Sequence, residues 1–107
     1  MRLPLLTLVA ATTLAACAKM PDAITPAAMP AGAYDALTCA AAQVERAAIT
    51  ANLAALSSQQ TSAATGDILS VFLLGIPVSG LAGSDKEGLL AVEKGKALAV
   101  AARLARC

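Results

Sequence analysis

The residues of this chain most able to do chemistry are its three cysteines, Cys17, Cys39 and Cys107. A thiol can be acylated, can pair in a disulfide or can act as a nucleophile. The chain has no histidine, which removes the commonest general base and most zinc sites. No two carboxylates are spaced as an obvious acid–base pair. We therefore predict no catalytic residue, no metal site and no cofactor, and we expect that the chain is not an enzyme.

Cys17 follows an N-terminal stretch that has the marks of an export signal. Arg2 is the only charge before it, Leu3 to Ala11 form a short apolar run, and Leu14-Ala15-Ala16 directly precede the cysteine. A basic start, a short apolar run and small residues before a cut are typical of such signals. The sequence Leu-Ala-Ala-Cys also resembles the lipobox of bacterial lipoprotein signal peptides. The resemblance implies a diacylglyceryl group on the Cys17 thiol, cleavage before it and acylation of the new amino terminus.

The lipoprotein resemblance also implies a location. Two or more acyl chains hold a protein firmly to a bilayer, so the expected partner of Cys17 is the membrane itself. Residue 18 is Ala rather than Asp, which in the lipoproteins that this chain resembles favours transfer to the outer membrane. We expect residues 1–16 to be the signal peptide and the rest to face the periplasm from the inner leaflet.

The composition of residues 17–107 describes one small helical domain. This part has 91 residues, with seven basic and seven acidic side chains, so no basic patch exists to hold nucleic acid. Alanine accounts for 28 of the 107 residues, and Tyr34 and Phe72 are the only aromatic residues. Such a chain forms helices readily, but its short side chains fill only a thin core. We predict no nucleic-acid partner and no small-molecule substrate.

We predict that residues 17–36 are a lipidated cysteine followed by an extended tether. Pro21, Pro26 and Pro30 interrupt a segment without an apolar period, so it should be extended or disordered. In a polyproline-like form residues 18–36 would reach at most roughly 60 Å. The tether would let the folded part stand clear of the lipid headgroups.

Two helical segments follow, at about 38–65, with a possible extension to 74, and at about 85–106. Thr38 or Asp35 can serve as the first N-cap, and Ser84-Asp85-Lys86-Glu87 has the pattern of a capping box. Steps of three and four residues mark one side of each segment, typical of a contact between two helices. We call these two sets the seams. The first is Cys39, Ala42, Arg46, Ile49, Leu53, Leu56, Gln60 and Ala63; the second is Lys86, Leu90, Glu93, Ala97, Val100, Leu104 and Cys107.

Cys39 and Cys107 form an even pair in an oxidising compartment, so a disulfide is expected. The two cysteines lie in phase with the first and second seams. Antiparallel helices with 39 opposite 107 would place Ile49 by Ala97 and leave the long side chain of Glu93 to bend out to water. The predicted fold class is therefore all-α: an antiparallel, coiled-coil-like helical hairpin over 37–107, closed by one disulfide, on a disordered N-terminal tether.

Residues 68–83 are the most apolar part after Cys17, and Gly and Pro interrupt them. A membrane-spanning helix needs about 20 apolar residues, so we predict a helical piece to about Leu74 and a loop over about 75–84. Phe72, Leu73, Leu74 and Ile76 are candidate contacts to a membrane or a partner. The alternative, which we favour, is that they pack back on the hairpin over Leu89 and Val92. The four candidates and Ile68 and Leu69 are called the apolar tip below.

The second helix carries a stripe of small residues beside its seam. Gly88, Ala91 and Gly95 are the members expected to let another backbone approach closely, since glycine inside a helix otherwise costs about 1 kcal/mol relative to alanine. Drift in an alanine-rich sequence is an equal alternative.

Residues 37–107 also resemble a group of small uncharacterised bacterial lipoproteins. That group has a Cys early in its first helix, a Gln near its end, a Gly-Ile/Leu-Pro segment, a Lys-Gly in its second helix and a terminal Cys. The matching positions here are Cys39, Gln60, Gly75-Ile76-Pro77, Lys94-Gly95 and Cys107, with Asp67 before the Gly-Ile-Pro run. The chain departs from the group at Lys96, where Glu is usual. The resemblance implies the architecture and no activity.

Two functions fit these observations. The first is a structural or adaptor role, in which the apolar tip or the small-residue stripe binds an envelope protein or a second copy of the chain. The alternative is a membrane-active lipoprotein whose apolar tip inserts into lipid and perturbs it.

Overall fold

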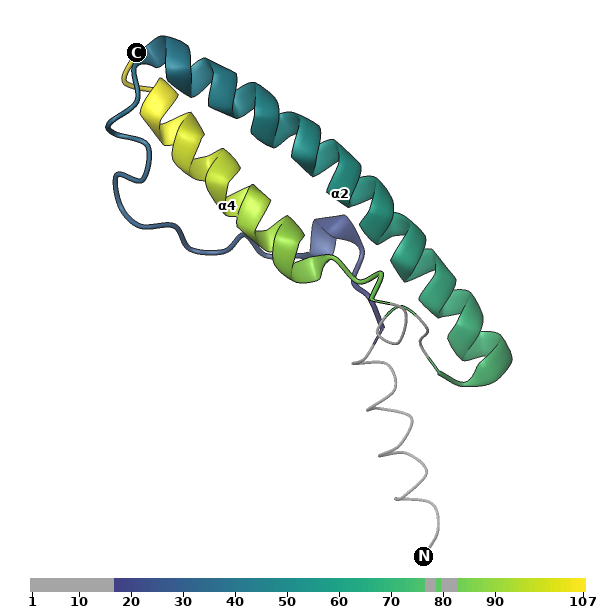
Figure 1. The fold of residues 1–107 in the computed structure, drawn as a ribbon. Helices are drawn as coiled ribbons and strands as arrows, with labels where there is room; N and C mark the ends of the chain where they lie inside the picture. Colours follow the sequence, from purple (N-terminus) through teal and green to yellow (C-terminus); the bar gives the residue numbers. More distant parts are fainter. Residues whose placement is uncertain (1–16, 77–78, 80–82) are drawn as a thin grey trace, which may run out of the picture.

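A computed structural model of the chain describes residues 17–76, 79 and 83–107. Its elements are a short 3₁₀ helix, η1 (Pro21–Ala23), a long helix, α2 (Cys39–Leu74), and a shorter helix, α4 (Glu87–Leu104). Residues 1–16, which were predicted to be a signal peptide, and residues 77–78 and 80–82 lie outside the described residues. Helices α2 and α4 lie side by side and antiparallel, and α2 extends well beyond the start of α4 (Figure 1). The predicted helical hairpin is confirmed.

The ends of α2 follow from local sequence. The Thr38 hydroxyl accepts a hydrogen bond from the Ala41 amide at 3.1 Å, as an N-cap should. Gly75 ends the helix in the left-handed conformation, with φ at 76°, and its amide donates to the Val71 carbonyl. The longer of the two predicted extents of this helix is therefore the one observed. Gly66 weakens the helix without stopping it.

The predicted capping box at the start of α4 is wrong. Helix α4 begins at Glu87 with Lys86 as its N-cap, and the Ser84 hydroxyl donates to the Ser79 carbonyl. The first amides of the helix find other acceptors. The Asp85 carboxylate accepts from the Glu87 amide at 3.0 Å, and the side chain of Gln60 on α2 accepts from the Lys86 amide at 2.7 Å. The Asp85 carboxylate and a contact from the other helix together take the place of the predicted Ser84 cap.

The disulfide closes the hairpin as predicted. Cys39 and Cys107 are bonded, with their Cα atoms 5.9 Å apart. Between the helices, the buried side chains of Ala42, Ile49 and Val100 form a small cluster. The half-buried residues Tyr34, Leu37, Leu53, Ala97 and Leu104 pack against it. The core is one side chain thick, as the composition predicted.

The position of the Glu93 side chain differs from the prediction. The side chain does not bend out to water: Glu93 is only 9% exposed. Its Oε1 atom lies 3.0 Å from the Lys96 ammonium one turn along the helix. Its other oxygen, Oε2, is buried and has no hydrogen-bond partner among the described residues, so Lys96 balances the charge through one oxygen alone.

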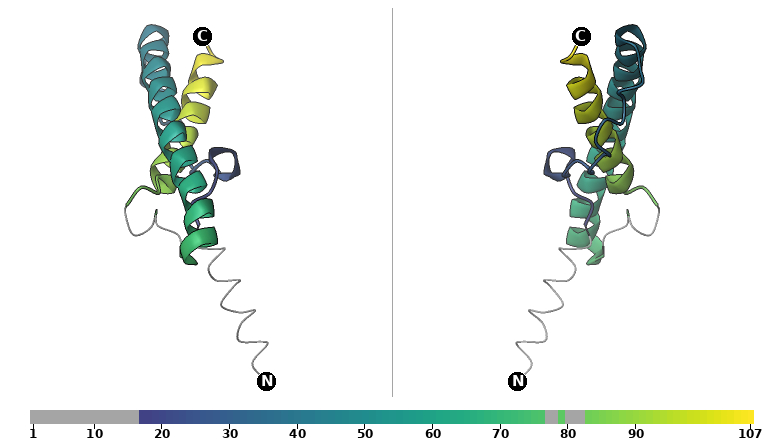
Figure 2. Two further views of the ribbon diagram at one scale, coloured as in Figure 1. Left: turned by 90° about the vertical axis from the view of Figure 1, so that its right-hand side faces the viewer. Right: turned by 90° about the vertical axis from the view of Figure 1, so that its left-hand side faces the viewer.

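Residues 18–36 contain η1 and turns over 31–36 as well as extended stretches, and they do not form a disordered tether. They run from the tip end of α2 along α4 to the disulfide end, and η1 lies against the hairpin (Figures 1 and 2). The Ala27 amide donates to the Ala91 carbonyl at 2.8 Å. The Lys94 ammonium donates to the carbonyls of Pro21 and Ile24 at 2.5 and 2.9 Å. The segment is held because α4 supplies both an acceptor and a cation to its backbone.

Gly95 explains why this segment can lie so close. A Cβ atom at this position would be 2.2 Å from the Ala27 carbonyl oxygen, whereas real contacts of this kind are longer than 3 Å. At Gly95 and Ala91 another backbone thus lies close to the small-residue stripe. The approaching backbone belongs to the N-terminal segment of the same chain, so this part of the stripe is already occupied. A Cβ at Gly88 would meet no atom within 4 Å.

The two glycines of α4 make a matched test. Gly95→Ala should push the 21–29 segment off α4 and destabilise the fold by about 1–3 kcal/mol, the usual cost of overpacking. Gly88→Ala should be neutral or stabilise it by up to about 1 kcal/mol, because only the helix propensity changes. Thermal unfolding and hydrogen exchange of the Ala27 amide measure both effects. Equal behaviour of the two variants would contradict the observed packing.

Candidate functional site

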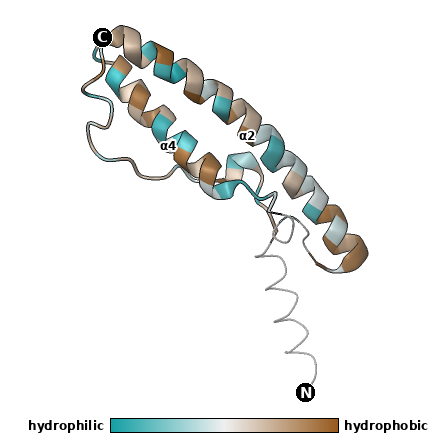
Figure 3. Cartoon of the chain, in the orientation of Figure 1, coloured by the Kyte–Doolittle hydropathy of each residue, from teal (hydrophilic) through white to brown (hydrophobic). Residues whose placement is uncertain are grey.

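The apolar tip is exposed. Phe72 is 85% exposed, and Ile68, Leu69, Leu73, Leu74 and Ile76 are all at least 48% exposed. Leu89 and Val92, on α4, are exposed as well, so the favoured alternative, in which the tip packs back over them, is wrong. The reason is geometric: α2 continues as a straight helix past the start of α4, and its end overhangs. Figure 3 shows the apolar residues gathered at this end of α2.

A buried carboxyl group ties the start of residues 17–36 to this end of the hairpin. Asp67 is fully buried on α2. One oxygen accepts from the Ser79 amide at 2.7 Å, and the other accepts from the Ala18 amide at 2.6 Å and from the Ser79 hydroxyl. Ala18 packs with Ala63 and Ala64 in a second small cluster. Residue 17 is therefore beside α2 within about one turn of the apolar tip.

Gln60 makes a second connection among the same segments. This fully buried amide donates to the Lys19 carbonyl at 2.8 Å and to the Asp85 carboxylate at 3.0 Å. Its oxygen accepts from the Lys86 amide. A single side chain thus joins α2, the N-terminal segment and the start of α4. The Lys19 side chain, which Gln60 does not contact, forms an exposed ion pair with Glu87, with its ammonium nitrogen 3.0 Å from the carboxylate oxygen.

The structure separates the predicted site residues into two groups. Cys17, which is half-buried, lies at the same end as Phe72, Leu73, Leu74 and Ile76. The disulfide lies at the opposite end. From Cys39 to Phe72 the helix rises about 50 Å at 1.5 Å per residue. The predicted lipid-bearing residue and the predicted apolar contact are thus neighbours, although 55 positions separate them in the sequence.

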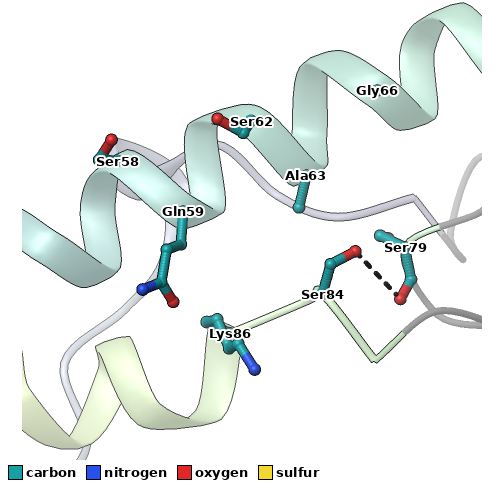
Figure 4. A pocket seen from close by; sticks show the side chains of 8 residues that line it. All are labelled: Ser58, Gln59, Ser62, Ala63, Gly66, Ser79, Ser84 and Lys86. Atoms are coloured by element: carbon teal, nitrogen blue, oxygen red, sulfur yellow. Dashed lines mark hydrogen bonds between the residues drawn. The ribbon is translucent and has the colours of Figure 1, made fainter.

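A pocket with several polar residues in its lining, called the polar pocket below, opens next to the apolar tip. It has a volume of about 440 Å³ and is lined by Ser58, Gln59, Ser62, Ala63, Gly66, Ser79, Ser84 and Lys86. Figure 4 shows the Gln59 side chain extending from α2 toward the segment that carries Lys86, at the start of α4, while the Lys86 ammonium points away from Gln59. Within the described part of the chain, Ser58, Gln59 and Ser62 make no side-chain hydrogen bond. The pocket therefore offers unused hydroxyl and amide groups beside one cation.

The disulfide end is closed by charged side chains. The Arg103 guanidinium donates to the Leu37 carbonyl at 2.7 and 3.0 Å and lies 3.3 Å from the Cys107 sulfur. Arg106 pairs with Asp35. Beside them is a cavity of about 350 Å³ that includes Tyr34 among its lining residues. These contacts fix the end of residues 17–38 against α4.

The pKa values of Tyr34 and Lys96 are both raised above their ordinary values. Partial burial raises the pKa of the Tyr34 phenol, and the charge of Glu45 acts in the same direction. The hydrogen bond to Glu93 raises the pKa of the Lys96 ammonium. The folded state holds both protons more tightly than the unfolded chain does. Their contribution to stability is therefore present below the ordinary pKa values and is lost as the pH rises through the raised ones.

Sequence reasoning named Gln60, Asp67 and Lys94 in the resemblance to the lipoprotein group, and Gln60 in the first seam, but predicted none of their contacts. A signal for Asp67 was present, since the seam continues beyond Gln60 and Ala63 to positions 67 and 70. Both positions are buried. A buried position occupied by Asp needs hydrogen-bond partners, and these came from distant segments. Nothing in the local pattern of α4 indicated that Lys94 binds backbone carbonyls.

None of the helices in residues 17–76 and 83–107 is long and apolar enough to cross a membrane. In the same described residues, no three histidine, cysteine or acidic side chains gather as metal ligands. Comparison with known protein families, curated proteins and solved structures finds no match for this chain. The functional argument therefore starts from its own residues.

Proposed function

We propose that the chain is a membrane-anchored lipoprotein with a structural role, held by lipid on Cys17 and seated on the bilayer through its apolar tip. Anchor and tip act together at one end. The disulfide end projects from the membrane, on the periplasmic side of an outer membrane. The proposed function includes the predicted lipid anchor and the insertion of the tip into lipid. It does not include a perturbation of the bilayer by the tip.

The observation that carries the proposal is the bond between Asp67 and the Ala18 amide. It keeps residue 17 within about one turn of an exposed apolar surface. Acyl chains on Cys17 would enter the bilayer beside this surface. Full burial of an apolar side chain as large as Phe is worth about 1.5–3 kcal/mol, and lipid is the apolar medium nearest to Phe72.

The packing of residues 18–36 supports a seated rather than a distant protein. A free tether could hold the hairpin up to roughly 60 Å away. Hydrogen bonds from Asp67, Gln60 and Lys94 hold residues 18–24 against the hairpin. This length of chain therefore does not separate the hairpin from the membrane. With the tip in lipid and α2 upright, the disulfide would stand about 40 Å from the acyl region at 1.5 Å per residue.

A second candidate is the adaptor role, with an envelope protein as the partner. At Gly95 the small-residue stripe is covered by the Ala27 backbone, so a partner protein could not contact the stripe at that point. The cavity beside Tyr34, Arg103 and Arg106 at the disulfide end favours a partner there. An adaptor of this kind would be fixed to the membrane at one end and would meet its partner at the other.

A single tryptophan tests the proposed seating, because the natural chain has none. Phe72→Trp in the lipidated protein, reconstituted in vesicles, should show blue-shifted emission that brominated acyl chains quench. Val44→Trp is the matched control: Val44 is an apolar residue on α2 that is 72% exposed, about 42 Å farther along the helix. Its emission should be that of a tryptophan in water, unaffected by the bromine.

The protein for this test should come from bacterial membranes, and its intact mass should match an acylated chain that starts at Cys17. Unquenched, water-like emission from Phe72→Trp in such a protein would refute the seating of the tip. An unacylated chain that keeps residues 1–16 would refute the anchor.

A further inference from the structure

The polar pocket beside the apolar tip is a candidate ligand site that the anchor and the tip do not use. Its volume of about 440 Å³ lies within the range of about 300–1,000 Å³ typical of pockets for small ligands. The groups available in it are the Lys86 ammonium, the Gln59 carboxamide and the hydroxyls of Ser58 and Ser62. An ammonium and several neutral donors match an anionic group with several acceptor oxygens, such as a phosphate.

The nearby acidic groups are occupied and do not cancel this cation. The Asp67 oxygens accept from Ala18 and Ser79. The Asp85 carboxylate accepts from Gln60 and from the Glu87 amide, and Glu87 pairs with Lys19. The Lys86 ammonium donates only one bond that the structure describes, to the Gly83 carbonyl at 3.2 Å. Two of its three N–H groups therefore remain for a ligand.

The height of the pocket on α2 suggests where the phosphate comes from. Gly66 precedes Ile68, the first residue of the tip, by about 3 Å along the helix, and Ser62 precedes it by about 9 Å. With the tip in the hydrocarbon and α2 upright, these positions coincide with the headgroup layer, which is about 5–8 Å thick on each side of a bilayer. The pocket would then face phosphate groups held at its own level.

We propose that this pocket binds the headgroup of an anionic phospholipid of the phosphoglycerol type. Lys86 and Gln59 hold the phosphate oxygens, and the serine hydroxyls bond with the hydroxyls of the glycerol. The inference rests on the proposed seating of the tip, since without it the pocket would stand clear of the headgroups. It adds a preference among lipids, which an apolar tip and acyl chains alone would not have.

The test uses the lipidated full-length protein in nanodiscs of phosphatidylcholine with a rising fraction of phosphatidylglycerol. The amide NMR signals of Gln59, Ser62, Ser84 and Lys86 should shift and saturate as that fraction rises. Lys86→Gln should weaken the response about fivefold, the usual effect of one lysine near an anionic surface. The double variant Lys19→Gln, Glu87→Gln removes a lysine from the same end without touching the pocket lining and without freeing the Glu87 carboxylate, and should leave the response close to that of the natural protein.

Four results would overturn the headgroup site. These are the absence of saturable shifts, equal losses in Lys86→Gln and in the Lys19→Gln, Glu87→Gln double variant, shifts confined to residues outside the pocket, and equal shifts when free glycerol phosphate is added to pure phosphatidylcholine discs. The last would assign the pocket to a soluble phosphate. Phe72→Trp measured in the same discs separates the two proposals: quenched emission without a lipid preference refutes the headgroup site and leaves the seating intact.

Discussion

Replacement of Cys39 and Cys107 by alanine should lower the free energy of unfolding by about 4 kcal/mol. The disulfide joins residues that are 68 positions apart, and in the chain-entropy model a loop of that length is worth about this much. Natural domains have a net stability of only about 5–15 kcal/mol, and the contacts between α2 and α4 involve few large side chains. Urea unfolding followed by circular dichroism measures the loss.

Reduction supplies the control for this prediction. A reductant should destabilise the natural protein by a similar amount and should have no effect on the variant that lacks both cysteines. The disulfide also holds the end of residues 17–38, because the Arg103 guanidinium that bonds to the Leu37 carbonyl lies against the Cys107 sulfur. A loss smaller than about 1 kcal/mol would mean that the packing between the helices, and not the covalent link, holds the hairpin.

Asp67→Asn should destabilise the fold by about 3 kcal/mol. Both oxygens of Asp67 accept backbone amides, from Ala18 and Ser79, and an asparagine offers only one oxygen. Its amide group would face a buried N–H donor, and a buried donor without an acceptor costs about 1–3 kcal/mol, more where a charged group is lost. The Ala18 amide should also exchange its hydrogen faster, since its acceptor is weakened.

Asp22→Asn is the matched control, because Asp22 is exposed and the described residues provide it with no side-chain partner. Its effect should stay within about 0.5 kcal/mol, as for most surface substitutions. Comparable losses in the two variants would show that net charge, and not the buried bonds of Asp67, sets the stability. Brominated-lipid quenching of Phe72→Trp in the Asp67→Asn background would then show whether anchor and tip stay together.

Much of the hairpin could be predicted from local patterns. The pairing of Cys39 with Cys107 was correct, and the structure selects Thr38 from the two predicted N-cap candidates and Leu74 from the two predicted ends of the first helix. Each depends on a residue type that strongly prefers its conformation, or on a period that repeats over many turns. The failed capping box shows the limit of such patterns. Ser84 has the right type and spacing, but Asp85 accepts from the Glu87 amide and Gln60 from α2 accepts from the Lys86 amide.

The candidate site was less predictable for a physical reason. The exposure of Phe72 depends on where α4 starts relative to α2, because a helix end is covered only if another element reaches it. Lys94 fits a general expectation that cations stabilise the last turns of a helix. In the structure it binds the carbonyls of Pro21 and Ile24 instead, which its neighbours in sequence do not indicate.

The sequence by itself determined the two helices, their thin contact surface and the disulfide, because these depend on propensity, period and the pairing of two cysteines. The tertiary structure decided the path of residues 18–36, the exposed tip and the polar pocket. The bonds responsible join residues 49, 41 and 73 positions apart, in the contacts of Asp67 with Ala18, Gln60 with Lys19 and Lys94 with Pro21. A proline-containing segment has no period of its own, so its path is set by the donors and acceptors that the folded hairpin presents to it.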